Sequence, residues 1–237
     1  MRYMLDFHLH LARLPHAEEL KGALEKRDYR YISIACEPWE WEKVAKLGCE
    51  AVAFGIHPMI ATELSSEAFE TLENFLTTNE SASVGECGLD KRYPGYEEGG
   101  IQEQVFLKQV ALAVKYRRDL QIHCVGDYGR IVKLLKQENY PPKGDGESSP
   151  KPIFHRFGGD AGIIRAALPL DALFSIHADS FHKKSTAATI AQIPEENIRF
   201  ETDADETTFK TETVEEIAEK LTANLAAVQD AWRHTKA

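Results

Sequence analysis

Eight short apolar runs alternate along the chain with segments that carry the periodicity of amphipathic helices. Parallel strands need long crossover connections, which are usually helices, so this alternation is typical of a parallel α/β fold. The predicted strands cover residues 2–8, 31–36, 51–56, 83–87, 120–124, 152–155, 172–176 and 197–202. The predicted helices cover residues 17–26, 39–47, 67–77, 102–116, 128–137, 160–168, 185–192 and 213–234.

Eight strand–helix pairs in 237 residues predict an α/β fold of the (β/α)8 TIM-barrel type, forming a single domain over residues 1–237. A doubly wound open sheet is the alternative. Residues 140–152 are rich in proline, glycine and serine, but the strand–helix pattern continues unchanged after them. We therefore interpret this stretch as a surface loop and not as a domain linker.

Histidine and carboxylate side chains fall at the C-terminal ends of the predicted strands. The first strand leads into His8 and His10, and residues two apart on an extended chain point to the same side. In a barrel these ends meet at one face, where active sites are built. The later strands end at or lead into His57, Glu86, His123, His155 and Asp203.

Each of these residues alone has an ordinary structural explanation. A His-x-His pair occurs by chance in strands, Glu86 could form a salt bridge at a strand end, and His123 could be a core histidine bonded to backbone carbonyls. Asp203 could cap a helix. The combination of ligand-type residues at several strand ends of one barrel is hard to explain in these ways, and it predicts a metal site.

The ligand types restrict the metal. Imidazoles combined with carboxylates suit zinc, manganese, iron or nickel better than calcium, which prefers oxygen alone. Two ions fit better than one, because Glu86 lies midway in strand order and could bridge them. Two ions about 3.5–4 Å apart stabilise both the attacking and the leaving oxygen of a displacement, so the prediction is hydrolysis.

These residues lie in motifs that occur in the order found in one known family, and the chain resembles the TatD-like metal-dependent hydrolases, which include deoxyribonucleases. The resemblance spans residues 6–205, and Gln102, Phe106 and Gln109 belong to it. Its motifs are Asp6-Phe7-His8-Leu9-His10, Gly55-Ile56-His57-Pro58, Gly85-Glu86-Cys87-Gly88-Leu89-Asp90, Ile122-His123, His155-Arg156-Phe157-Gly158-Gly159 and Glu201-Thr202-Asp203-Ala204.

The resemblance implies a phosphodiesterase that binds two divalent metal ions, with zinc, magnesium and manganese as the candidates. In that family His8, His10 and Asp203 would hold one ion, His123 and His155 the other, and Glu86 would bridge them. Asp203 would also accept the proton of a metal-bound water. His57 would contact the substrate, or else stabilise the turn before Pro58.

The chain departs from the family pattern after two of these residues. His123 is followed by Cys124-Val125-Gly126-Asp127, where the family usually has an arginine. Arg156 could supply a replacement guanidinium for a substrate phosphate. Asp205 and Glu206 follow Asp203 closely, and this added negative charge weakens the case for DNA as the substrate.

Composition leaves three functions open. With 28 Lys and Arg against 38 Asp and Glu, the net charge of −10 argues against a broad basic surface for nucleic acid. The first function is a nuclease acting on DNA or another phosphodiester. The second is a hydrolase of a C–N, ester or phosphomonoester bond in a small molecule, and the third is a catalytically silent barrel that retains metal for stability.

The remaining features concern the compartment. The four cysteines form no C-x-x-C pair, so we expect reduced and mostly buried thiols. An acidic residue and two histidines interrupt the first ten residues before an apolar core can form, so the N-terminal segment does not resemble a signal peptide. No apolar run approaches the length of a membrane span. We expect a cytoplasmic protein without membrane contact, of unknown oligomeric state.

Overall fold

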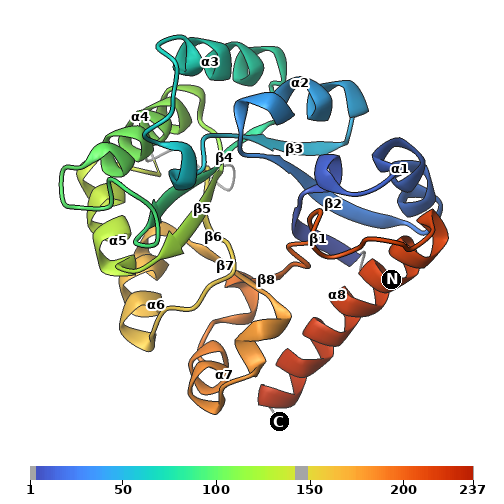
Figure 1. Ribbon diagram of the computed structural model, residues 1–237. Helices are drawn as coiled ribbons and strands as arrows, with labels where there is room; N and C mark the ends of the chain where they lie inside the picture. The colour runs from blue at the N-terminus through green and yellow to red at the C-terminus, as the bar shows by residue number, and fades with distance from the viewer. Residues whose placement is uncertain (1–3, 142–148, 237) are drawn as a thin grey trace.

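The computed structural model describes residues 4–141 and 149–236. Its eight parallel strands form a closed barrel, in which each strand pairs with the next along the chain and β8 pairs with β1 (Figure 1). The predicted barrel is therefore confirmed, and the open sheet is excluded. The strands are β1 (Met4–Leu9), β2 (Tyr29–Ala35), β3 (Ala51–Phe54), β4 (Ser83–Asp90), β5 (Leu120–Val125), β6 (Pro152–Phe154), β7 (Leu173–Ile176) and β8 (Ile198–Phe200).

Eight α-helices surround the strands, and two of them, α1 (Ala17–Lys26) and α5 (Tyr128–Gln137), have the predicted bounds. The others are α2 (Pro38–Leu47), α3 (Ala68–Thr78), α4 (Ile101–Tyr116), α6 (Ala161–Ala167), α7 (Lys184–Ile190) and α8 (Val214–Lys236). Short 3-10 helices are η1 (Leu11–Arg13), η2 (Pro58–Ile60), η3 (Leu168–Leu170), η4 (Ala178–Phe181) and η5 (Glu195–Asn197).

Local sequence explains several helix ends. Helix α2 begins with Pro38 at its first position and a capping box between Glu37 and Glu40, and it ends at Gly48, whose φ of 59° suits glycine. Asp127 and Asp160 accept hydrogen bonds from the first-turn amides of α5 and α6. These caps set where each helix starts after the preceding strand.

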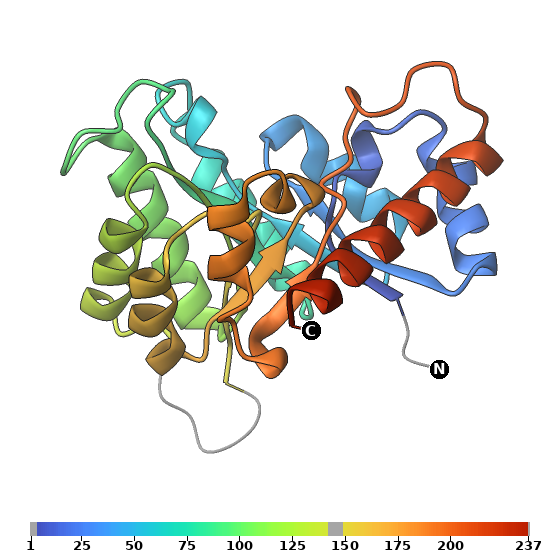
Figure 2. The same cartoon turned by 90° about the horizontal axis from the view of Figure 1, so that it is seen from below.

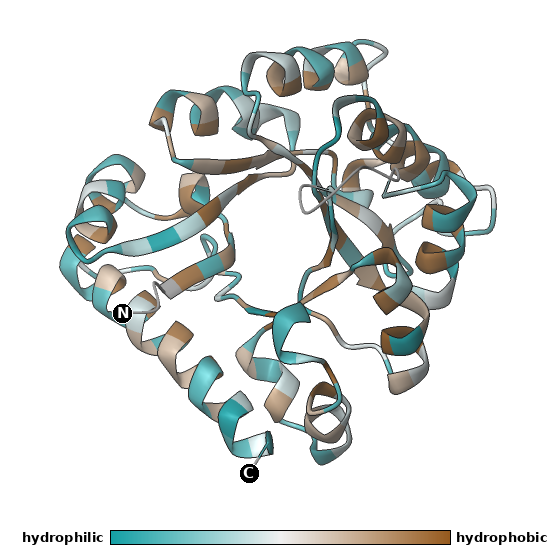
Figure 3. Ribbon diagram, turned by 180° about the vertical axis from the view of Figure 1, so that it is seen from behind, coloured by the Kyte–Doolittle hydropathy of each residue, from teal (hydrophilic) through white to brown (hydrophobic). Residues whose placement is uncertain are grey.

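The main core lies between the strands and the helices, whose apolar faces turn towards the barrel (Figure 3). Phe154 and Phe174 stack with ring centroids 5.8 Å apart, and Phe157 packs edge-on against Phe174 at 4.8 Å. Trp41 is buried and donates its indole N–H to the carbonyl of Gly55. Helix α8 packs against α1, α7, β1 and β8. It therefore covers the side of the barrel where the first strand pairs with the last (Figure 2).

The largest difference from the predicted strands is in β4, which continues past Cys87 to Asp90. It stays paired with β5 as far as Asp90. Glycine at position 88 permits this close pairing, because a side chain there would collide with the carbonyl oxygen of His123. Glu86 therefore lies within β4 and Asp90 ends it. Residues 142–148 of the predicted surface loop lie outside the described residues.

The helices of the described chain include no candidate membrane-spanning segment.

Candidate metal centre

All the predicted ligand residues gather near the C-terminal ends of the strands. A cavity of about 420 Å³ opens there, and Glu86, His10, His57 and Asp203 are among the residues that line it. His123 lies within β5, whereas His155 and Asp203 follow β6 and β8 directly or after a few residues. The barrel thus brings residues that are up to 195 positions apart in the chain to one place, as the strand-end argument predicts.

Glu86 is the centre of this arrangement and is 3% exposed. Its Oε2 lies 3.3 Å from Nε2 of His8 and 3.7 Å from Nε2 of His10. Its Oε1 lies 2.7 Å from Nδ1 of His123, 3.5 Å from Nε2 of His155 and 3.7 Å from Nε2 of His57. Each carboxylate oxygen therefore faces its own set of imidazoles, which is the geometry expected of a bridging carboxylate.

Asp203 faces the same space from the other side. Its Oδ1 lies 3.7 Å from Nε2 of His10 and 3.8 Å from Nε2 of His155. Its φ of 50° is left-handed, and its backbone N–H donates to the carbonyl of His8 at 3.0 Å. This contact ties the segment after β8 to β1, so the unusual backbone conformation directs the carboxylate at His10 and His155.

Electrostatics in the site favour positive charge. Burial opposes protonation of His8, but the Glu86 carboxylate outweighs it and raises the pKa of His8 to about 9. Burial likewise opposes the charged form of His123, but Asp90 and Glu86 raise its pKa to about 9. For His57 burial dominates and lowers the pKa to about 3. The carboxylates thus create a negative electrostatic potential, which stabilises a bound proton or a bound metal cation.

The ligand atoms form overlapping groups within 4.8 Å of one another among the described residues. One group is His8, His10 and Asp203, as predicted for the first ion. Another of these groups contains His57 with Glu86 and His123, and the Oε1 atom of Glu86 that faces them also lies 3.5 Å from His155, the predicted partner of His123. The ring centroids of His123 and His155 are 6.1 Å apart, whereas those of His57 and His123 are 4.4 Å apart.

The donor atoms that face one another support a metal at this centre. Nε2 of His8 and Nε2 of His10 lie 3.3 and 3.7 Å from Oε2 of Glu86, and Nε2 of His10 also lies 3.7 Å from Oδ1 of Asp203. Imidazole nitrogens and carboxylate oxygens are also the donors that borderline divalent cations prefer. The residues present therefore fit a divalent metal ion.

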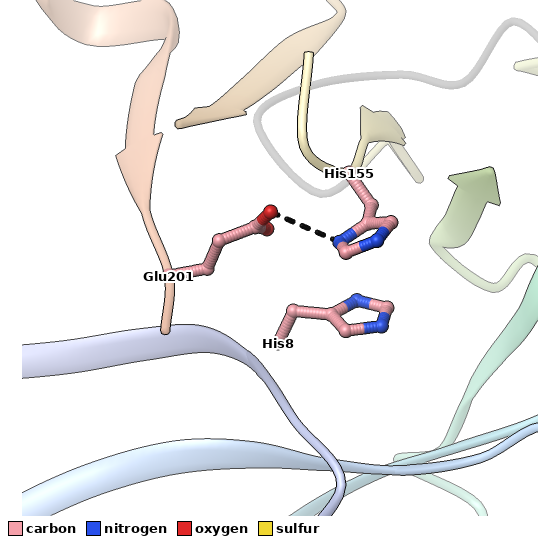
Figure 4. Close-up of side chains that lie close together, drawn as sticks. All are labelled: His8, His155 and Glu201. Carbon is pink, nitrogen blue, oxygen red and sulfur yellow. Dashed lines mark ion pairs between the residues drawn. The ribbon is translucent and has the colours of Figure 1, made fainter. Parts of the chain in front are cut away.

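Two further carboxylates contact the histidines, and sequence reasoning assigned neither of them a role. Oε1 of Glu201 lies 3.0 Å from Nδ1 of His155, whose ring stacks on that of His8 (Figure 4). Oδ2 of Asp90 lies 2.9 Å from Nε2 of His123. Metal-binding histidines usually contact such a carboxylate with their second nitrogen, so the pairing rule could have found both.

The glutamines of the family motif hold the backbone beside these residues. The side-chain amide of Gln102 accepts from the N–H of Asp90 and donates to its carbonyl. Gln109 makes the same pair of hydrogen bonds to Ile56, next to His57. Both glutamines come from α4, so this helix fixes the ends of β3 and β4 at the site.

Arg156 lies at the mouth of the cavity and is half exposed. Its guanidinium donates to Oδ2 of Asp203 at 2.7 Å and to Asp179, while its backbone N–H donates to Glu201 at 2.6 Å. Arg13 and Arg92 also line the cavity, and each pairs with carboxylates. Three guanidiniums therefore line this cavity, although each is held by acidic neighbours.

A barrel with imidazoles and carboxylates gathered around one buried glutamate defines the class of metal-dependent hydrolases. The family model described as "TatD related DNase" matches residues 5–233, so this chain belongs to the TatD family. The family membership predicted from the motifs is thereby confirmed.

Curated relatives and solved structures agree with this. The chain is 26% identical over 153 residues to the uncharacterized metal-dependent hydrolase YabD of Bacillus subtilis, covering 64% of this chain and 57% of the relative. It is 29% identical over 155 residues to the 3'-5' ssDNA/RNA exonuclease TatD of Pantoea vagans, covering 63% and 56%. The match thus spans little more than half of each relative. A TatD family hydrolase from Entamoeba histolytica has the same fold, with a TM-score of 0.77, 16% identity, and coverage of 99% of this chain and 91% of that one.

Proposed function

We propose that this protein is a divalent-metal-dependent phosphodiesterase that hydrolyses single-stranded nucleic acid, DNA or RNA. The observation that carries the proposal is the placement of Glu86, whose two oxygens face two sets of imidazoles. The relative from Pantoea vagans, named an ssDNA/RNA exonuclease, supports the choice of substrate. The name of YabD supports metal dependence.

Two ions fit this arrangement, with zinc, magnesium and manganese as candidates. His8, His10 and Asp203 would hold one ion, and His123 and His155 the other, with Glu86 between them. Divalent cations there would supply Lewis acidity, which activates water and offsets the charge of the phosphate. His57 is neutral because burial lowers its pKa to about 3, so it can contact a phosphate oxygen or serve as a further ligand beside His123.

The protein groups have separate tasks in this reaction. Asp203 accepts the proton of the attacking water through Oδ1, the oxygen that faces His10 and His155. Arg156 holds the other oxygen of Asp203 and orients it. Arg156 is also half exposed at the cavity mouth, so it can bind a substrate phosphate. Glu201 and Asp90 hold the rings of His155 and His123.

Aromatic rings beside the arginines support a nucleic-acid substrate. Tyr93 lines the cavity with Arg92 over its ring, and Trp39 is 58% exposed with Arg13 over its ring. Aromatic side chains next to cations are typical of single-strand binding, because every base can stack on them.

The test is hydrolysis by the full chain loaded separately with zinc, manganese or magnesium. The substrates are end-labelled single-stranded DNA, single-stranded RNA and bis(p-nitrophenyl) phosphate. Glu86→Gln removes the central charge, and Glu138→Gln is the matched control on the exposed end of α5. We expect cleavage of both polymers by the wild type and the control, and none by Glu86→Gln. Equal cleavage by all three proteins would contradict the proposal.

A small-molecule hydrolase is the second candidate. The 420 Å³ cavity has the size of a small-ligand pocket, and the pairing of Arg13 and Arg92 with carboxylates favours it. Turnover of bis(p-nitrophenyl) phosphate without cleavage of either polymer would support this candidate. Metal binding without any hydrolysis would support the catalytically silent barrel.

A further inference from the structure

Cys36 belongs to the wall of the metal centre, although sequence reasoning predicts only a buried thiol there. It follows β2 directly, is 2% exposed, and lines the same cavity as His10 and Glu86. The other three cysteines have different surroundings. Cys87 donates to the carbonyl of Gln121, Cys49 accepts from the Tyr31 hydroxyl, and Cys124 belongs to no group of close ligand atoms among the described residues.

The backbone of Cys36 is held at both of its polar groups. Its N–H donates to Oε2 of Glu40 at 2.9 Å, and its carbonyl accepts from the N–H of His57 at 2.8 Å. Glu40 is itself buried and paired with Arg13. The Cα–Cβ bond therefore starts from a fixed position, which is what a preorganised ligand requires.

The sulfur lies among metal donors. Sγ of Cys36, a ring nitrogen of His10 and a carboxylate oxygen of Glu86 lie within 4.8 Å of one another. Zinc binds sulfur at about 2.3 Å and imidazole nitrogen at about 2.0–2.1 Å, so one ion could contact all three after small side-chain movements. Arg13 donates to Sγ at 3.6 Å, so the sulfur accepts a hydrogen bond from a cationic group.

We propose that Cys36 is a thiolate ligand of the cation held by His10 and Glu86, which makes the centre selective for thiophilic ions such as zinc and cobalt. On binding, the S–H bond breaks, the proton goes to solvent, and the sulfur electron pair forms the bond to the metal without any redox change. Thiolate is a soft ligand that favours zinc over magnesium or manganese. This inference rests on the metal centre of the proposed function.

Cobalt substitution tests the ligand directly, without using activity. The full chain is stripped of metal, titrated with Co²⁺ alone, and followed by absorption spectroscopy. A thiolate ligand produces a sulfur-to-cobalt charge-transfer band in the near ultraviolet, and we expect this band in the wild type. Cys36→Ser should lose the band while keeping the visible cobalt bands, and Cys124→Ser, a change in the same cavity wall, should keep both.

A competition between zinc and manganese measures selectivity. We expect Cys36→Ser to weaken zinc binding about 10-fold or more, the range found when groups that support a metal site are removed, and to change manganese binding much less. An unchanged zinc-to-manganese preference would overturn the inference.

The wild-type spectrum keeps the test decisive if Cys36→Ser does not fold. Cobalt bound without a charge-transfer band overturns the role of Cys36 and leaves the metal centre standing. A band that disappears in Cys124→Ser also overturns it. Failure of the wild type to bind any divalent cation overturns the metal centre itself, and with it this inference.

Discussion

Asp6 in β1 and Glu86 in β4 are both buried carboxylates of the barrel strands, but their neighbours differ. Asp6 accepts hydrogen bonds from the Tyr29 hydroxyl at 2.7 Å, from the N–H and hydroxyl of Thr202 at 3.0 and 2.5 Å, and from the N–H of His8 at 3.2 Å. Glu86 instead faces imidazole nitrogens. Asp6 joins β1, β2 and the segment after β8, whereas Glu86 lies at the centre of the candidate cation site.

The charge of each carboxylate follows from these neighbours. Burial raises the pKa of Asp6 to about 6, and its hydrogen bonds offset only part of this effect. Burial would also raise the pKa of Glu86, but His155 and His8 hold it well below its usual value. Burial alone therefore does not reveal a functional carboxylate. The distinction lies in whether its partners are neutral donors or groups that can carry or bind a positive charge.

Replacement of the central carboxylate should have the largest effect. Glu86→Gln keeps the shape of the side chain but removes the charge shared by the two sets of imidazoles. We expect kcat/KM to fall at least ~1000-fold, because Lewis-acid stabilisation contributes several kcal/mol. Kinetics on bis(p-nitrophenyl) phosphate and metal analysis measure this. Activity within tenfold of the wild type would contradict the assigned role of Glu86.

Replacement of the structural carboxylate should instead reduce stability. Asp6→Ala leaves the Tyr29 hydroxyl, the Thr202 groups and the His8 amide without their acceptor. We expect the free energy of unfolding to fall by ~3 kcal/mol while the metal stoichiometry stays unchanged. Urea unfolding followed by circular dichroism measures the change. Tyr29→Phe removes a single hydrogen bond and should cost only ~1 kcal/mol.

Removal of metal should distinguish the structural role of Asp6 from the metal-binding role of Glu86 in one experiment. Ligands that bind only the folded state stabilise it by about 2.7 kcal/mol at a hundredfold excess over Kd. At this chain length that corresponds to a Tm about 5–10 °C lower after chelation. Thermal denaturation should show this decrease in the wild type and in Asp6→Ala, but not in Glu86→Gln. A decrease of equal size in Glu86→Gln would mean that the metal binds elsewhere.

The smallest of these effects concerns a carboxylate that acts through a histidine. Glu201→Gln keeps an acceptor for the N–H of Arg156 but removes the charge beside Nδ1 of His155. We expect metal affinity to weaken about 10–100-fold, with the free energy of unfolding of the metal-free protein changed far less than in Asp6→Ala. Calorimetric titration with zinc measures this. Unchanged affinity would reduce Glu201 to a backbone anchor for Arg156.

Much of the candidate centre could be predicted because a parallel barrel places the C-terminal ends of all its strands at one face. That rule places His8, His155 and Asp203 together without knowledge of any contact. It cannot predict the contacts within the face, such as the approach of the His57 ring to that of His123. His155 follows β6, the direct neighbour of β5, yet its ring lies farther from that of His123 than the ring of His57 does, so side-chain packing and not strand order sets these distances.

The periodicity of the chain predicted the barrel, and the resemblance of its motifs to those of one family predicted the family. The residue types at the strand ends predicted several residues that meet at the candidate centre, because the C-terminal ends of barrel strands lie at one face. The partners of each group depend on packing between distant segments. Asp6 and Glu86 are both acidic residues in strands, yet Asp6 accepts a hydrogen bond from the Thr202 hydroxyl, whereas Glu86 lies next to the imidazole of His123. The approach of Cys36 to His10 and Glu86 likewise arises only when the ends of β1, β2 and β4 meet.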